Sequence, residues 1–124
     1  MSSQTEARQL VVVVTHGIDH ELSSVAFTIA CGGITAGLRV SVFLTSAGVD
    51  LARKRALELA HVPPLDPLQR LVRDFVERGG KLWACSPCVK SRGYGPGDFI
   101  DGVEITGASV LHAQLLQGAA TLSF

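Results

Sequence analysis

The chain has 124 residues, 47% of them hydrophobic, and its eleven basic and eleven acidic side chains balance to a formal net charge of zero. This length fits one domain, which at this size buries roughly two thirds of the surface that its unfolded chain exposes. A neutral chain has no net field that draws it toward nucleic acid or an anionic membrane, and we expect neither partner. The apolar segments are shorter than the roughly 20 residues of a membrane-spanning helix. Three cysteines, an odd number, without an export leader indicate a cytoplasmic protein with reduced thiols.

The first predicted strand, Gln9–Thr15, is apolar and β-branched at its centre, which is typical of a strand covered on both faces. A helix then begins after Gly17, with Asp19 as its expected N-cap, and ends near Gly37. This helix carries two apolar stripes between Leu22 and Leu38, although one stripe is enough to cover a sheet.

The second predicted strand, Arg39–Thr45, leads into a turn at Ser46–Gly48 and a short helical stretch over Val49–Leu59. A proline-rich bend follows and breaks the chain. An amphipathic helix then runs from Asp66, its expected N-cap, to Gly79, because its apolar residues recur at helical spacing on one face.

Lys81–Ala84 is short and apolar enough for a third buried strand, with Cys85 at its carboxyl end. Ser86 is the expected N-cap of the next helix, which closes at Gly93. A strand, a helix and a last strand follow at Val103–Thr106, Ala108–Gln117 and Ala119–Phe124.

Strands that alternate with helices predict an α/β fold, with a parallel sheet and helices on both faces. We expect one domain over residues 10–124 after a flexible start at residues 1–9. In such folds the ligand chemistry collects beyond the carboxyl ends of the strands. The cysteines of the third strand and its helix are predicted to lie at that edge.

The stretch KLWACSPCVKSRGY places Cys85 and Cys88 three positions apart, directly after an apolar run. A thiol at a helix amino terminus faces unpaired N–H groups and the positive end of the helix dipole, and both lower its pKa. Lys90 and Arg92 add positive charge nearby. We therefore expect reactive chemistry at both thiols, with Cys85 the more nucleophilic. The alternative is that one or both are small buried hydrophobes.

Two other readings of the C-S-P-C pair are weaker. A structural zinc site needs four ligands, and the remaining candidates are scattered, so we expect no metal and no cofactor. Those candidates are Cys31, His16, His20, His61 and His112. A thioredoxin-like redox motif is locally similar, but it would come early in the chain and would be followed by a proline that precedes a strand.

The order of four segments, VVVVTHG, ITAGLRVSVFLTSAGV, LWACSPCVKSRGY and DFIDGVEITGASVLHAQLL, resembles the DsrE/DsrF-like family, which includes sulfur-relay subunits. The resemblance implies a three-layer α/β/α sandwich with a mostly parallel five-stranded sheet, of the YchN-like type, assembled as trimers or hexamers. In sulfurtransferase members a cysteine after a strand carries sulfur as a persulfide, and the glycine of an R-G pair follows eight residues later. Cys85 matches that position, with Arg92 and Gly93 completing the pattern.

Cys88 is an addition to the pattern of the relay subunits, and it would resolve a persulfide or a disulfide. Three functions therefore stay open. The first is a sulfurtransferase, or persulfide carrier, that uses Cys85 and exchanges sulfur with a donor or acceptor protein. The second is a thiol-disulfide oxidoreductase. The third is a binding module that holds a small ligand or partner without turnover.

Other residues are expected at the same edge of the sheet. His16 follows the first strand, where it would take a thiol proton, although a structural turn histidine explains the same position. Ser46 would help to shape a pocket after the second strand, and Arg92 would add charge. Cys31 lies on an apolar stripe and is expected in the core or an interface. The second stripe of the first helix also predicts a homo-oligomer, a trimer or hexamer, because no other element is left to cover it.

Overall fold

The computed structural model describes residues 8–56 and 61–124. Five strands form one sheet in the order β4-β3-β2-β1-β5, and all four pairings are parallel. The strands are β1 (Gln9–Val14), β2 (Arg39–Leu44), β3 (Lys81–Cys85), β4 (Val103–Thr106) and β5 (Ala120–Ser123). Each lies within one residue of its predicted bounds at either end. Positions 1–7 of the expected flexible start over 1–9, and positions 57–60 of the expected helical stretch, lie outside the described residues.

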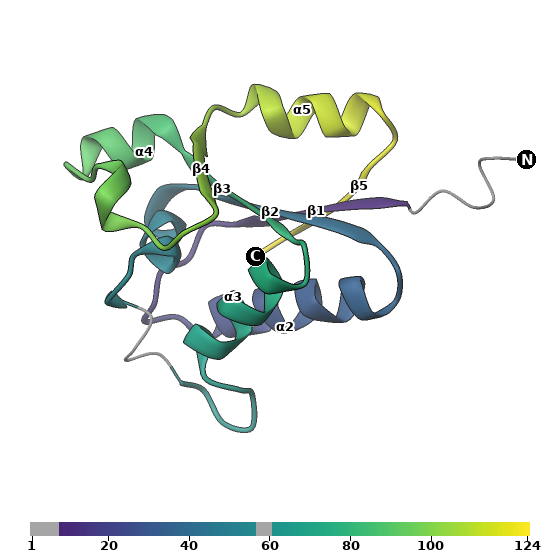
Figure 1. Ribbon diagram of the computed structural model, residues 1–124, viewed down its shortest axis with the longest axis horizontal. Helices are drawn as coiled ribbons and strands as arrows, with labels where there is room; N and C mark the ends of the chain where they lie inside the picture. Colours follow the sequence, from purple (N-terminus) through teal and green to yellow (C-terminus); the bar gives the residue numbers. More distant parts are fainter. Residues whose placement is uncertain (1–7, 57–60) are drawn as a thin grey trace, which may run out of the picture.

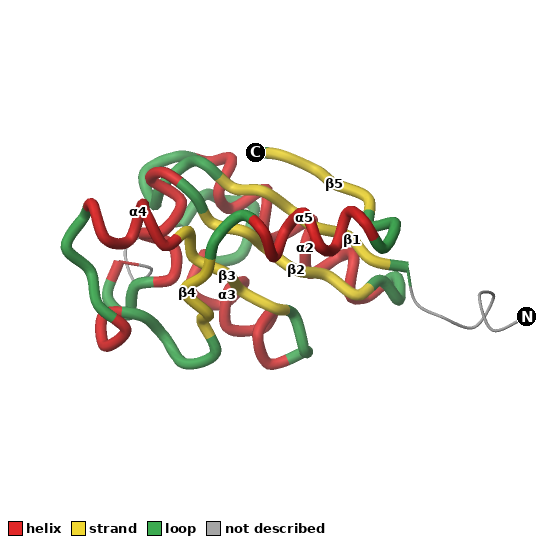
Figure 2. The backbone as a smooth tube through the Cα atoms, turned by 90° about the horizontal axis from the view of Figure 1, so that it is seen from above, coloured by secondary structure: helices red, strands yellow, loops and turns green. Residues whose placement is uncertain are grey.

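Helices cover both faces of the sheet, which confirms the three-layer α/β/α fold. On one face lie α2 (Glu21–Thr35) and α3 (Leu68–Glu77), and on the other lies α5 (Ser109–Leu116) (Figures 1 and 2). The short α4 (Ser86–Ser91) lies at the edge beyond β3, and its Val89 packs into the same core as α2 and α3. Two 3-10 segments, η1 (Ser46–Ala52) and η3 (Pro96–Asp98), lie in the connections. Over residues 8–56 and 61–124, no helix has both the length and the apolar character needed to cross a membrane.

The main core lies between the sheet and the α2–α3 layer. The valines and leucines of β1 and β2 that face this layer are fully buried, and each such side chain contributes roughly 1.5–3 kcal/mol. Phe27 of α2 meets Phe75 of α3 edge to face, with ring centroids 5.9 Å apart. A much smaller cluster, Val11, Phe43 and Trp83, lies on the opposite face under α5. The two faces of the sheet are therefore unequally covered.

Contacts between α2 and α3 correct the expectation that the second stripe of α2 is left over. Phe27 and Cys31 of that stripe are buried inside the chain, and Cys31 Sγ donates to the Leu71 carbonyl at 3.4 Å. The amphipathic helix α3 supplies the cover that the sequence reasoning had not found. Ile29 is the one large hydrophobic side chain of α2 that stays exposed.

The starts of α2 and α3 both differ from the predicted caps. His20, and not Asp19, caps α2, because its Nδ1 accepts the Leu22 N–H at 3.1 Å. The N-cap of α3 is Pro67, one residue after Asp66, and no side chain bonds to the free N–H groups there. A residue that precedes proline is disfavoured in helical conformation, which moves the helix start along the chain.

The segment expected as a helical stretch over Val49–Leu59 is instead the tighter η1, which begins already at Ser46. Its first turn is held by the Gly48 N–H, which donates to the Thr45 carbonyl at 2.9 Å. A Cβ added at Gly48 would collide with the carbonyl oxygen of Val14, the last residue of β1. The chain therefore needs glycine here, because backbone from two segments meets without room for a side chain.

We expect Gly48→Ala to lower the free energy of unfolding by about 1–3 kcal/mol, because the new methyl group meets rigid backbone and forces η1 off β1. The matched control is Gly32→Ala in α2, where an added Cβ meets nothing within 4 Å. That change should raise stability by about 0.5–1 kcal/mol through helix propensity. Denaturant unfolding of both variants measures the difference, and equal midpoints would contradict the close packing at Gly48.

Candidate functional site

The site lies at the carboxyl edge of the sheet, where neighbouring strands end in register. Leu44, the last residue of β2, pairs with Ala84 of β3, so the residues that follow the two strands lie side by side. Thr45 and Ser46 follow β2, and Cys85 ends β3. The parallel pairing therefore brings a hydroxyl, a turn amide and the cysteine pair together from segments about 40 residues apart.

The turn from β3 into α4 sets the direction of the two thiols. Cys85 is the N-cap and Ser86 the first helical residue, one position earlier than predicted. Pro87 lies in the first turn, where its missing N–H costs nothing. Cys88 then faces the turn after β2, and its Sγ accepts the Ser46 N–H at 3.2 Å and lies 3.5 Å from Thr45 Oγ1.

Ser46 adopts an unusual backbone conformation to make this contact. Its φ is +53°, and it is the one non-glycine residue with positive φ in the described part of the chain. A left-handed conformation costs an ordinary residue about 1–2 kcal/mol. Such strain persists only where surrounding contacts hold it, and it gathers at functional sites. Here the strained residue is Ser46, whose N–H donates to Cys88 Sγ.

The surroundings of Cys88 lower the pKa of its thiol. The largest cause is the Thr45 hydroxyl, which hydrogen-bonds to the sulfur and favours the thiolate. Partial burial acts in the opposite direction. The Ser46 amide, the Cys85 thiol and the charge of Arg92 lower the pKa further. The reactive chemistry expected of the pair, and the greater nucleophilicity expected of Cys85, stay predictions.

A second set of contacts holds the segment after α4 against η1. Tyr94 Oη donates to Asp50 Oδ1 at 2.6 Å, and the guanidinium of Arg53 lies over the tyrosine ring at 4.4 Å from its centre. The carboxylate at the hydroxyl raises the pKa of Tyr94. The Tyr94 N–H donates to the Val89 carbonyl at 3.1 Å, next to Cys88. This clamp ties the cysteine helix to the turn that faces its thiol.

The remaining predicted site residues divide into two groups. Ser46 and Arg92 are brought to Cys88, since Arg92 Nη1 also donates to the Cys88 carbonyl at 3.5 Å. His16 instead stacks on His20, with ring centroids 3.9 Å apart, and its buried Nδ1 has no hydrogen-bond partner among the described residues. No hydrogen bond in this part of the chain joins His16 to a cysteine, so its role in proton transfer stays a prediction.

Three residues of the site, Thr45, Tyr94 and Asp50, were not predicted from the sequence. Thr45 was counted as the end of a strand, although a hydroxyl at the carboxyl end of a parallel strand is a usable signal for a site. Tyr94 closes the quoted cysteine stretch, yet nothing in the sequence pairs it with Asp50, 44 positions earlier. That contact depends on how η1 folds.

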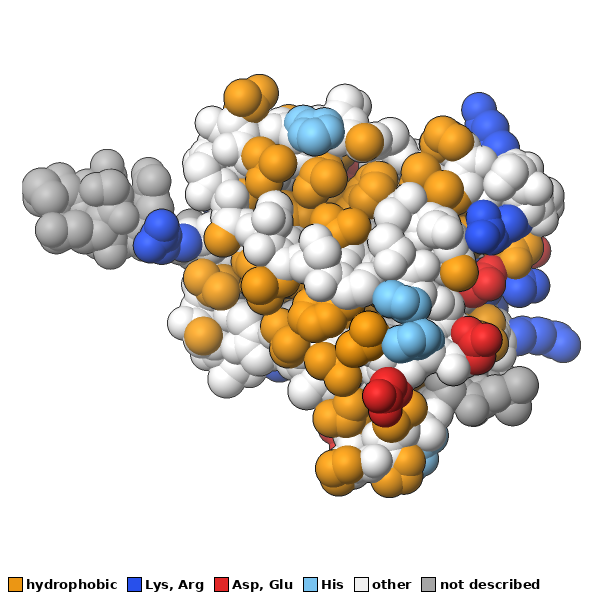
Figure 3. All heavy atoms as spheres, turned by 180° about the vertical axis from the view of Figure 1, so that it is seen from behind, with side chains coloured by type: hydrophobic (Ala, Val, Ile, Leu, Met, Phe, Trp, Pro, Cys, Tyr) orange, Lys and Arg blue, Asp and Glu red, His pale blue; other side chains and the backbone are white. Residues whose placement is uncertain are grey.

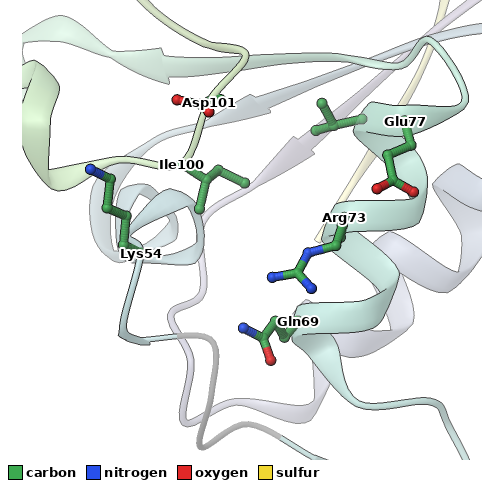
Figure 4. Close-up of a pocket in the computed structure, with 7 residues that line it drawn as sticks. Lys54, Gln69, Arg73, Glu77, Ile100 and Asp101 are labelled. Carbon is green, nitrogen blue, oxygen red and sulfur yellow. The ribbon is translucent and has the colours of Figure 1, made fainter.

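A cavity of about 580 Å³ lies elsewhere on the molecule. Lys54, Gln69, Arg73, Ile100 and their neighbours line it, between α3 and the chain before β4 (Figure 4). Neither Cys85 nor Cys88 lines this cavity or the two smaller ones. Within the ranges 8–56 and 61–124, no group of three or more His, Cys, Asp or Glu side chains could hold a metal ion.

A parallel α/β/α domain with a thiol pair at its sheet edge is the class that these observations define. A family model of the DsrE/DsrF-like family matches residues 8–124, and the chain belongs to this family. An uncharacterized protein of Methanopyrus kandleri is 30% identical over 95 residues, which are 77% of this chain and 75% of that protein. One of Methanocaldococcus jannaschii is 29% identical over 105 residues, or 84% of this chain but only 38% of that protein.

Solved structures show the same fold. The YchN protein of E. coli superposes with a TM-score of 0.78 at 19% identity, covering 96% of this chain and 100% of that one. A protein of unknown function from Methanobacterium thermoautotrophicum gives a TM-score of 0.73 at 18% identity, with coverages of 96% and 100%. These likenesses establish the architecture.

We expect Cys31 to be inert in the folded protein, because burial, and then the charge of Asp74, raise the pKa of its thiol from 9.0 to about 11. Alkylation at pH 8 should label Cys85 and Cys88 in the native state and Cys31 only after denaturation. Because the pKa of the Cys31 thiol is raised in the folded state, the protonated thiol contributes to stability below pH 9. This contribution is lost as the pH rises toward 11. Fast native labelling of Cys31, mapped by peptide mass, would contradict this assignment.

Proposed function

We propose that this chain is a sulfurtransferase of the carrier type, which takes up sulfane sulfur as a persulfide on the Cys85–Cys88 pair and passes it to a partner protein's cysteine. The observation that carries the proposal is the contact of Cys88 Sγ with the Ser46 amide and the Thr45 hydroxyl, three positions from a second thiol. The resemblance to relay subunits assigns the carrier role to Cys85 and the resolving role to Cys88.

The place of the thiols supports a protein partner. Both thiols are only partly buried at the carboxyl edge of the sheet. A cysteine or persulfide on another protein's surface reaches an open edge directly. Exchange between free thiols also needs a reducing compartment, and a cytoplasmic setting is part of the proposal.

A thiol-disulfide oxidoreductase is the second candidate, favoured by the nearby Cys85 thiol, which lowers the pKa of Cys88. Both functions begin with a thiolate that attacks sulfur, and they differ in what leaves. In the carrier the sulfur passes on, whereas in the oxidoreductase an internal disulfide forms and a substrate disulfide is reduced. The binding module, the third alternative, needs neither step.

Incubation of the reduced protein with inorganic polysulfide should add one sulfur atom to the Cys85–Cys88 peptide, seen by mass spectrometry without reductant. The matched control is Cys31→Ser, which should load like the natural chain because Cys31 is buried. An acceptor thiol should then remove the sulfur. An internal disulfide with no retained sulfur would favour the oxidoreductase, and an unchanged mass would favour the binding module.

We also propose a homo-oligomer, on grounds different from the second stripe of α2. Residues 105–124 carry none of the chain's acidic or basic side chains, yet β5 is exposed throughout and α5 buries no residue. Leu116 is 90% exposed and Leu122 is 43% exposed. Seen from behind, hydrophobic side chains gather over the upper and central parts of the molecule, while most charged ones lie toward one margin (Figure 3).

An uncharged, partly apolar layer of this kind suits a second copy of the chain better than water. One eight-residue helix is also all that covers this side of a five-stranded sheet, apart from the short α4 at its edge. A neighbouring subunit that packs on α5 and β5 would complete the outer layer. The resemblance implies three or six copies.

Light scattering should give three or six times the chain mass of 13.1 kDa. Leu116→Glu should shift the mass toward one copy without loss of helical signal, because it places charge on an exposed side chain of the proposed interface. Arg70→Glu, an exposed position on α3, is the control for charge alone and should leave the mass unchanged. If light scattering gives the mass of one copy for the natural chain, the oligomer proposal is wrong.

A further inference from the structure

We infer that Cys88, and not Cys85, is the thiol that attacks incoming sulfur, with the Thr45 hydroxyl and the Ser46 amide as the hole that holds its thiolate. This inference divides the work between the two thiols of the proposed carrier and reverses the order that the resemblance implies. The sulfur-transfer reaction in this inference rests on the proposed function. The assignment of the thiolate to Cys88 can be tested separately.

The hole is formed by the turn after β2. The Thr45 N–H donates to the Val14 carbonyl at 3.0 Å, and the Gly48 N–H closes the turn on the Thr45 carbonyl at 2.9 Å. Between these two bonds Ser46 has its positive φ and directs its N–H at Cys88 Sγ. A donor fixed in this way by backbone needs no rearrangement when negative charge develops on the sulfur.

The thiol side is fixed as well. The clamp of Tyr94, Asp50 and Arg53 holds the chain after α4 on η1, and the adjacent Val89 is buried in the core. Cys88 therefore lies between two elements that are each tied to the same sheet. The helix α4 has only six residues, so the donors from the neighbouring turn, and not the helix dipole, select this thiol.

Cys85 has a different environment. It is the N-cap of α4 and makes no cap hydrogen bond with its side chain. Its side chain packs against the core clusters on both faces of the sheet, and its thiol lowers the pKa of Cys88. A thiolate at Cys88 with a second thiol beside it is the arrangement in which one thiol attacks and the other follows. Besides Cys85, Arg92 is the ionisable group that acts on Cys88.

The step balances without a further reactant. The Cys88 thiolate attacks the outer sulfur of a donor persulfide, R–S–SH, and a new S–S bond forms while the donor S–S bond breaks. The donor leaves as R–S⁻, and the protein holds Cys88–S–SH. An acceptor thiolate can then take the outer sulfur. If Cys85 instead attacks the Cys88 sulfur, hydrosulfide leaves and an internal disulfide forms.

Alkylation rate against pH, with each site followed by peptide mass, tests the thiolate assignment. In Cys85→Ser the fast phase should persist at Cys88, with a midpoint below the ordinary thiol value of about 8.5, and in Cys88→Ser it should vanish. Thr45→Val should raise the midpoint, so that labelling at pH 7 slows about threefold for each half unit. Thr45→Ser should restore it, because the hydroxyl returns.

Thr28→Val is the matched control, since Thr28 Oγ1 bonds to the Ser24 carbonyl within α2 and not to a residue of the cysteine site. It should leave the midpoint unchanged. A fast phase that maps to Cys85, or a Cys88 profile indifferent to Thr45→Val, would overturn the inference.

Polysulfide loading of the same variants separates this inference from the proposed function. Sulfur gained by Cys85→Ser, on Cys88, and lost in Cys88→Ser supports both. Sulfur that loads on Cys85 in Cys88→Ser at the natural rate overturns the order of attack and leaves the carrier function intact. If no variant and no natural chain gains sulfur while alkylation behaves as expected, the carrier function fails and Cys88 is still the attacking thiolate.

Discussion

The close approach of η1 to the end of β1 is the constraint on which the sheet edge depends. Gly48 leaves no room between its own Cα and the Val14 carbonyl, and the Thr45 N–H bonds to that same carbonyl. These contacts hold the turn after β2 against the end of β1. Because β2 pairs in register with β3, the fixed turn then lies beside the cysteine segment. The position of one glycine is thus linked to the environment of a thiol 40 residues further on.

The sequence predicted the architecture well, since five apolar runs separated by helical patterns specify a parallel sheet with few alternatives. The errors lie where local signals compete. Asp19 and Ser86 are good N-cap residues by type, yet His20 and Cys85 occupy those positions. Cap choice depends on the direction in which the chain leaves a strand, and a single sequence does not show it.

The candidate site was predicted only in part, because some of its contacts also depend on how separate segments meet. A cysteine pair after a buried strand can be recognised from spacing, and the rule for parallel sheets places it at the functional edge. The positive φ of Ser46 and the bond from Tyr94 to Asp50 arise from the meeting of separate segments. The apolar surfaces were predicted less well. The second stripe of α2, which was expected to be uncovered, is covered by α3. The uncharged stretch over 105–124 can be seen in the sequence, but no prediction was based on it.

Cys31 and Cys88 show how one fold gives the same side chain opposite properties. Cys31 meets a carbonyl and a carboxylate in a helix interface, where burial and Asp74 outweigh the charge of Arg78, and its thiol is held protonated. Cys88 meets a hydroxyl and an amide at a half-open edge, where donors outweigh the cost of partial burial. Both lie on helices that pack on the sheet, so secondary structure does not separate them. What separates them is burial beside the Asp74 carboxylate at Cys31 and a hydroxyl and an amide donor at Cys88, and the strained turn at Ser46 supplies that amide.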